Sequence, residues 1–74
     1  MIEAPPRTVD LTRREQEVLA GIADGLSSAE IGARLFLSVN SIKTHTRLAY
    51  RKIGVHSRAQ ATRWWLIGGM ADSA

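Results

Sequence analysis

Four helix-start signals divide this chain of 74 residues into short helical segments. In a capping box, a Ser or Thr and a Glu or Gln three residues later each satisfy a backbone N–H group at a helix start. Three pairs have this spacing: Thr12 with Glu15, Ser27 with Glu30, and Ser57 with Gln60. Ser38 is a fourth candidate cap. This density of helix starts predicts short helices joined by short loops.

Glycines mark where three of these helices end, because glycine readily adopts the left-handed conformation of a helix C-terminus. They are Gly25, Gly54 and the pair Gly68–Gly69. The signals together predict helices near residues 12–24, 28–36, 39–53 and 58–67. With no strand-like alternation of useful length, the predicted fold class is all-α. Because prolines exclude a helix near the start, we divide the chain into a flexible leader (1–10), one domain (11–69) and a tail (70–74).

Composition excludes several classes of protein. Cysteine is absent, which excludes disulfides, zinc–thiolate sites and a catalytic thiol. The most apolar stretch, WWLIGGM, is far shorter than the roughly 20 residues of a membrane-spanning helix. The N-terminus lacks the basic start and apolar run of a signal peptide. We therefore expect a soluble cytoplasmic protein that does not act at a membrane.

The candidate side chains for metal binding or catalysis do not form a site. His45 and His56 have no third ligand at helical spacing; we interpret His45 as partly buried and structural, and His56 as a turn residue. Glu15 and Glu17 point to different sides of a helix. The sequence has no nucleophile–base arrangement and no phosphate-binding glycine loop. We expect no metal, no cofactor and no enzymatic activity.

Charge is distributed unevenly along the chain. Residues 1–37 contain four basic and six acidic residues, whereas residues 38–74 contain six basic residues and one acidic residue. Such an asymmetry suggests that the second half meets a polyanion. By composition alone, a solvated basic surface explains it equally well.

The predicted third helix has two distinct faces. At about 100° per residue, one stripe is short-chained and faces a core shared with apolar residues of the first two helices. It consists of Ile42, Thr46, Ala49 and Ile53. An adjoining arc carries Lys43, Thr44, Arg47 and Arg51. A short helix, a tight turn and a longer helix with a basic outer face are the parts of a helix-turn-helix.

Duplex DNA suits this arrangement. Arg and Lys donate to the O6 and N7 acceptors of guanine in the major groove, and a threonine methyl group can contact the thymine methyl group. Hydroxyl and amide side chains at a helix start can bind phosphate oxygens. For this role the sequence offers Ser38, Asn40 and Ser41.

Several elements occur in a family-specific order: LTRRE, EVL, IADG, EIG followed by RL, LS, SIKTH, KIGV and SRAQA. From Leu11 to Ala61 the chain resembles a LuxR-type helix-turn-helix domain, the DNA-binding end of many bacterial response regulators and quorum-sensing regulators. The resemblance implies a four-helix domain whose third helix reads the major groove and whose fourth helix often mediates dimerisation. It assigns base contacts to Lys43, Thr44 and Arg47, and phosphate contacts to Ser28, the Ser41 region and Arg51.

Three positions depart from the family pattern. Leu48 is apolar where the family commonly has a polar residue, on or near the DNA-facing side, and therefore bears on sequence preference. Ala49 is smaller than the usual large aliphatic residue. Gly32 replaces the usual alanine inside the second helix, at a cost of about 1 kcal/mol in helix propensity. Two residues with implied DNA contacts have simpler interpretations. Arg51 is equally well an exposed charge, and Thr44 is alternatively a small polar residue of the surface.

The predicted fourth helix carries two adjacent tryptophans. Because neighbouring side chains differ in direction by roughly 100°, we expect one indole to close the core and at least one to be exposed in a monomer. Aromatic residues are enriched in interface cores, and we assign dimerisation to Trp64, Trp65, Leu66 and Ile67. Attachment to a membrane surface is disfavoured, since this brief segment carries only Arg63.

The resulting interpretation is a DNA-binding transcription regulator, acting as a homodimer on a near-palindromic site. A module similar to region 4 of sigma factors is the nearest alternative, although SRAQA and the tryptophans favour the LuxR type. Another alternative is an adaptor that uses the fourth helix to bind a regulator or RNA polymerase and binds DNA only non-specifically. Leu48 on the reading face supports that alternative.

Overall fold

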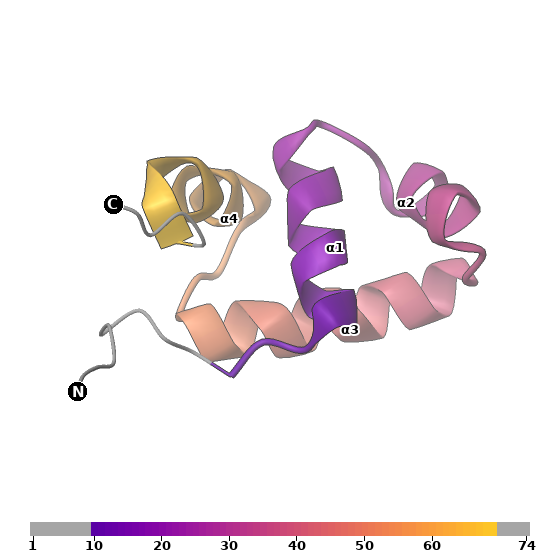
Figure 1. Ribbon diagram of the computed structural model, residues 1–74, viewed down its shortest axis with the longest axis horizontal. Coiled ribbons are helices and arrows are strands. Elements are labelled where there is room, and N and C mark those ends of the chain that lie inside the picture. The colour runs from indigo at the N-terminus through magenta and orange to yellow at the C-terminus, as the bar shows by residue number, and fades with distance from the viewer. Residues whose placement is uncertain (1–9, 70–74) are drawn as a thin grey trace.

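A computed structural model describes residues 10–69, and these form helices with no strand. In chain order the elements are α1 (Arg13–Ala23), α2 (Ser28–Leu35), α3 (Val39–Ile53), α4 (Arg58–Trp64) and a π-helical turn, η1 (Trp65–Gly69). The long helix α3 lies across one side of the molecule, α1 stands on its middle, and α2 and α4 flank α1 (Figure 1). The predicted all-α fold is confirmed, whereas most of the leader and all of the tail lie outside the described residues.

The helix starts follow the predicted caps. The reciprocal hydrogen bonds of a capping box are present at Thr12 and at Ser27. The hydroxyl group of Ser38 accepts from the N–H group of Ser41. Ser57 caps α4 in the same way, but the Gln60 side chain accepts from the N–H group of His56, 2.6 Å away, rather than from that of Ser57. Local sequence therefore places all four starts.

The turn between α2 and α3 contains a left-handed residue that is not a glycine. Phe36 is the C-cap of α2 and has a left-handed conformation, with φ 61°, although it is not a glycine. Its side chain is 93% exposed. The turn lies close against α2, because the N–H group of Leu37 donates to the carbonyl oxygen of Gly32 at 2.9 Å, and a Cβ atom on Gly32 would lie 2.6 Å from the Leu37 carbonyl oxygen. Because Gly32 has no Cβ atom, the turn can pack tightly against α2.

Replacing Phe36 with glycine is expected to raise the free energy of unfolding by about 0.5–1 kcal/mol. The change relieves the steric cost of a left-handed Cβ-bearing residue and removes a side chain that packs against little. Thermal unfolding followed by circular dichroism measures the effect. Gly54→Ala is the matched opposite change, since Gly54 has φ 76°, and it should lower stability by about 1 kcal/mol. Equal stabilities for Phe36→Gly and the parent chain would contradict this account.

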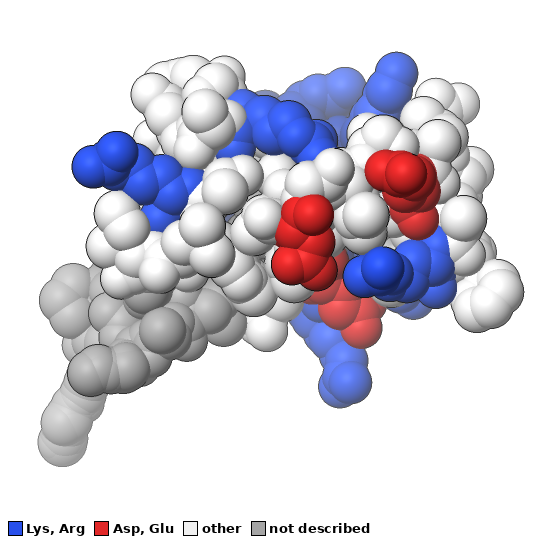
Figure 2. Space-filling view, turned by 90° about the horizontal axis from the view of Figure 1, so that it is seen from above, with Lys and Arg blue, Asp and Glu red and all other residues white. Residues whose placement is uncertain are grey.

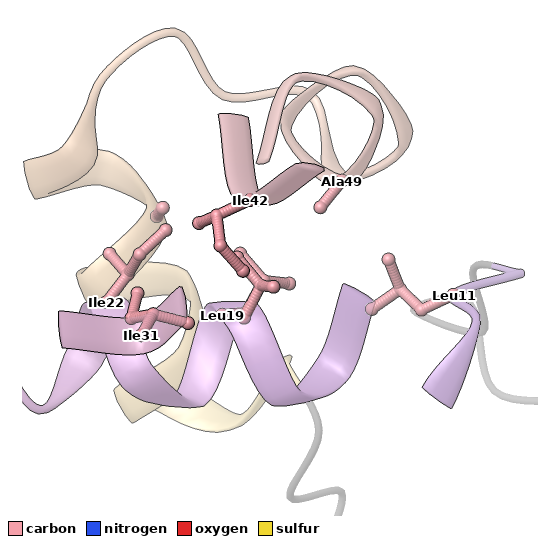
Figure 3. Close-up of a cluster of buried hydrophobic side chains, with 8 residues drawn as sticks. Leu11, Leu19, Ile22, Ile31, Ile42 and Ala49 are labelled. Atoms are coloured by element: carbon pink, nitrogen blue, oxygen red, sulfur yellow. The ribbon is translucent and has the colours of Figure 1, made fainter. Parts of the chain in front are cut away.

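One hydrophobic core joins the four α-helices. Its buried members are Leu11, Val18, Leu19, Ile22, Ile31, Ile42, Ala49 and Ala61, and Figure 3 shows side chains of α1, α2 and α3 converging on it. The expected stripe on α3 is confirmed at Ile42 and Ala49, while Thr46 and Ile53 are half-buried. Ala49 is fully buried, so its small side chain lets α1 and α3 pack closely.

The expectation of an exposed tryptophan is wrong. Trp64 and Trp65 are both half-buried and pack against the core. The α-helix ends at Trp64 and a π-helical turn follows, and this wider turn changes the angle between successive side chains. Trp65 consequently lies beside Gln16 and Ala20 of α1. In this segment the large apolar side chains that are exposed are instead those of Leu66 and Ile67, at 69% and 71%.

A buried ion pair joins the start of α1 to the end of α3. The Nζ atom of Lys52 lies 2.8 Å from a carboxylate oxygen of Glu15, whose side chain is 3% exposed. The same Nζ atom donates to the carbonyl oxygen of Asp10 at 2.8 Å. Burial acts to raise the pKa of Glu15, but the hydrogen bonds from Lys52 and Thr12 and the lysine charge outweigh it and lower the pKa. Glu15 therefore has a tertiary partner in addition to its capping box.

Candidate nucleic-acid interface

Helix α3 turns its polar residues away from the core. Opposite the buried Ile42 and Ala49, the exposed residues include Asn40, Lys43, Thr44, Arg47 and Arg51. These are the base-reading residues of the sequence analysis together with two of its phosphate contacts. The helix thus presents them to an outside partner on one continuous face.

The two serines at the start of α3 have different roles. The Ser38 hydroxyl group accepts from the N–H group of Ser41 at 3.1 Å and donates to the Ser41 hydroxyl oxygen, also at 3.1 Å. Ser38 is therefore engaged as the helix cap. The Ser41 hydroxyl group keeps its own hydrogen for a further acceptor. Of the two, Ser41 is better placed to donate to a ligand.

A groove brings together residues that the sequence suggested separately. It has a volume of about 670 Å³ and lies between the start of α2, one side of α3 and the turn before α4. Its walls include Ser28, Lys43, Arg47 and Arg51, with Tyr50 and His56. Ser28 is the first residue of α2, so the N–H groups of that helix start lie beside three cations. Helix starts favour anions, so the chemistry of this groove suits an anionic group.

Sequence reasoning missed Tyr50 and took His56 only as a turn residue. Tyr50 follows Arg47 by three positions and Lys43 by seven, a spacing that places the three on one side of a helix. Burial raises the pKa of Tyr50, although the charge of Arg58 opposes this effect. The phenol is therefore neutral at pH 7 and can donate a hydrogen bond. The spacing was a usable signal for Tyr50, whereas only the fold brings His56 into the groove.

In the part of the chain that the structure describes, the cations on the outward face of α3 have no acidic partner. Carboxylates elsewhere have partners: Glu15 pairs with Lys52, Glu17 with Arg13 and Arg14, and Asp24 with Arg34. Within residues 10–69, no carboxylate forms an ion pair with Lys43, Arg47 or Arg51. Figure 2 shows the side away from α3, where acidic and basic side chains are interspersed. Among the described residues, the charges of Lys43, Arg47 and Arg51 are thus available to an anionic partner, whereas that of Lys52 is paired with Glu15.

A second, apolar surface lies near the C-terminal end of the described chain. A shallow depression of about 800 Å³ is lined by the end of α1, by α4 and by η1. Leu66 and Ile67 border it. Arg58 closes one side, and its guanidinium group donates to the carbonyl oxygen of Leu26 in the α1–α2 loop. This surface lies apart from the groove beside α3.

Other kinds of site are not seen in the part of the chain that the structure describes. No three His, Cys, Asp or Glu side chains gather there as metal ligands. No helix among residues 10–69 combines the length and apolarity needed to cross a bilayer.

Comparison with known proteins identifies the family. The sequence profile described as "Bacterial regulatory proteins, luxR family" matches residues 9–65. A nitrate/nitrite response regulator protein homolog of Haemophilus influenzae is 52% identical over 52 residues, which are 70% of this chain and 25% of the relative. The CsgBAC operon transcriptional regulatory protein of Escherichia coli is 44% identical over 54 residues, 73% of this chain and 25% of that protein. The transcriptional regulatory protein LnrK of Bacillus subtilis is 40% identical over 60 residues, 81% of this chain and 27% of LnrK.

The chain spans about a quarter of the length of these relatives. The matched residues include all four α-helices, and the resemblance drawn from the sequence is confirmed. The family consists of transcription regulators rather than enzymes. The chain therefore belongs to the luxR family of bacterial regulatory proteins, whose helix-turn-helix domains bind DNA.

Proposed function

We propose that this domain recognises a specific duplex sequence by placing α3 in the major groove. Lys43, Thr44 and Arg47 read base edges. Phosphate oxygens are held by Ser28, Asn40, Ser41 and Arg51, with Ser38 serving mainly as the cap. The observation that carries the proposal is the groove in which the start of α2 meets three cations that form no ion pair with a carboxylate among residues 10–69. The setting we propose is the bacterial cytoplasm, at the nucleoid.

The groove suits one strand of the DNA backbone. A phosphate group seated there would meet the N–H groups at the start of α2 and the positive end of that helix dipole. Arg51 and Tyr50 line the same space, and both carry groups that can donate to a phosphate oxygen. With the backbone held on this side, the outward face of α3 is directed at the base edges.

Selection from randomised duplexes tests the proposal. The domain is incubated with the pool at moderate salt, and the retained duplexes are sequenced. Recovery of a fixed motif supports sequence-specific binding, and an inverted repeat with constant half-site spacing supports a dimer. Retention of unrelated sequences, with affinity that only falls as salt rises, would reduce α3 to a non-specific anchor.

We further propose that two copies associate through the surface around Leu66 and Ile67. These side chains are more than two-thirds exposed, and a second copy would bury them. The half-buried Trp64 and Trp65 would support this contact from beneath. A two-fold pair would place its two α3 helices about one DNA turn apart.

The double substitution Leu66→Asn, Ile67→Asn is expected to abolish association while leaving the fold intact, because both residues lie outside the core. Sedimentation at micromolar concentration should give a monomer. Affinity for an inverted repeat should fall by at least about 10-fold, because a copy bound at one half-site no longer helps a second copy to bind at the other. Affinity for a single half-site is the control and should not change. An unchanged sedimentation coefficient would contradict this interface.

The same apolar surface favours one second candidate. An adaptor would use Leu66 and Ile67 to bind a regulator or RNA polymerase, with DNA held only by charge. That function predicts no motif in the selection, together with polymerase binding that the double asparagine substitution abolishes. A recovered motif would leave polymerase as an additional partner rather than the principal one.

A further inference from the structure

Leu48 is an exposed apolar residue on α3 that neither the core nor the proposed contacts account for. Its side chain is 38% exposed and does not belong to the core cluster or to the partly buried residues packed against it. Its neighbours one turn away are Thr44 and Lys52. Lys52 is engaged with Glu15, so Leu48 shares its exposed edge of the helix with Thr44.

The helix geometry places Leu48 within the outward face. At about 100° per residue, the direction of Leu48 lies about 120° from that of Ile42, at the centre of the buried stripe. Lys43 lies about 100° away on the other side of that stripe. Lys43 and Leu48 thus mark the two edges of the outward face, with Arg47 between them. The cationic edge lines the groove beside α2, whereas the edge with Thr44 and Leu48 does not.

We propose that Thr44 and Leu48 together form an apolar edge that reads thymine through its C5-methyl group. The inference rests on the proposed binding of α3 in the major groove. A leucine side chain makes no hydrogen bond, and among the four bases the thymine methyl group is the apolar feature presented in that groove. A leucine pressed against polar base edges would desolvate them without compensation. Leu48 therefore selects for thymine on the strand that faces this edge, which gives the departure from the family pattern a role in specificity.

The test removes single methyl groups from the DNA. In a duplex recovered by the selection, each thymine is replaced in turn by deoxyuridine, and the Kd is measured by fluorescence anisotropy. One thymine per half-site should respond, with affinity falling about 4-fold, the value of one buried methyl group. Leu48→Ala should lose affinity for the thymine duplex and should no longer distinguish thymine from deoxyuridine at that position.

Val39→Ala is the matched control variant. Val39 is 39% exposed and lies on the other side of α3, about 40° beyond Lys43, so its truncation should leave the response to deoxyuridine unchanged. Thr44→Ser, which keeps the hydroxyl group and removes a methyl group, should reduce the response partly. Because Leu48 lies outside the core, Leu48→Ala is expected to fold, and its circular dichroism spectrum and melting temperature check this.

The outcomes separate this inference from the proposed function. A motif that contains thymine and is insensitive to deoxyuridine would overturn the role of Leu48 and leave sequence-specific binding intact. Full sensitivity retained in Leu48→Ala would do the same, by assigning the methyl contact to another residue. Failure to recover any motif would overturn both.

Discussion

Replacing Lys52 with methionine is expected to lower the free energy of unfolding by about 2–3 kcal/mol. The substitution keeps most of the side-chain length but leaves the Glu15 carboxylate, 3% exposed, without its cation. This loss in the free energy of unfolding lies at or below the usual range for breaking a buried ion pair. The reason is that the Lys52 side chain is itself 34% exposed, so water reaches the ion pair. Urea unfolding at pH 7 followed by circular dichroism measures the change.

Two further variants isolate the ion pair. Glu15→Gln retains an oxygen that can accept from the N–H group of Thr12, and the double variant with Lys52→Met leaves no unpaired charge; it should recover to within about 1 kcal/mol of the parent. Lys43→Met makes the same substitution at an exposed lysine of α3 and should change stability by at most about 0.5 kcal/mol. Equal losses in the single and double Lys52 variants would show that packing of the lysine stem, not charge, is responsible.

The lowered pKa of Glu15 fixes the direction of the pH dependence. In acid the unfolded chain takes up this proton before the folded protein does, so stability rises with pH in that window. The contribution of Glu15 is therefore fully present above about pH 4.3, the ordinary value for a glutamate, and is lost as the pH falls through the lowered pKa. In Lys52→Met the pKa of Glu15 should rise, because burial is then opposed by Thr12 alone. The loss of stability on acidification should be smaller in that variant.

Arg47→Ala is expected to weaken binding to a selected duplex by about 1–3 kcal/mol and to relax the preference at one base pair. Arg47 is exposed in the middle of the outward face, and no carboxylate competes for it among residues 10–69. A guanidinium group in the major groove can donate twice to one guanine. Binding measured against duplexes with each base pair changed in turn locates the lost preference.

Arg51→Ala is the matched control for Arg47→Ala. It removes the same group one turn further along α3, where we assign a phosphate contact. Its effect should be similar for specific and unrelated duplexes, and the dependence of log K on log salt should become shallower by about one unit. Unchanged base preference in Arg47→Ala would move base readout away from this residue, whereas a lost preference in Arg51→Ala would exchange the two roles.

Much of the fold is predictable from the sequence because its signals are local. The Thr12 and Ser27 capping boxes depend on side chains three residues from the groups they bind, and both are present. The same holds for the left-handed Gly54 that ends α3. The α3 stripe at Ile42 and Ala49 follows from periodicity alone. Caps and stripes of this kind depend only on residues within one helix, and local sequence specifies that helix.

The candidate site is predictable in part. The sequence shows that Lys43, Thr44 and Arg47 share a helix face, and the structure exposes all three. It does not show that Ser28 of α2 lines one groove with Lys43 and Arg47, or that His56 lines it too. Those residues are far apart in the chain, and their meeting depends on how α2 and α3 pack.

The sequence by itself determined four capped helices, an apolar stripe for the core and a cationic face on α3, since each follows from spacings of a few residues. Tertiary structure decided the rest: the left-handed Phe36 in a turn packed on α2, the π-helical turn that half-buries both tryptophans, the Lys52–Glu15 pair and the groove beside α2. The ion pair and the groove depend on which atoms of distant segments meet when the core closes. Local propensity carries no information about such contacts, because their free energy exists only in the packed chain.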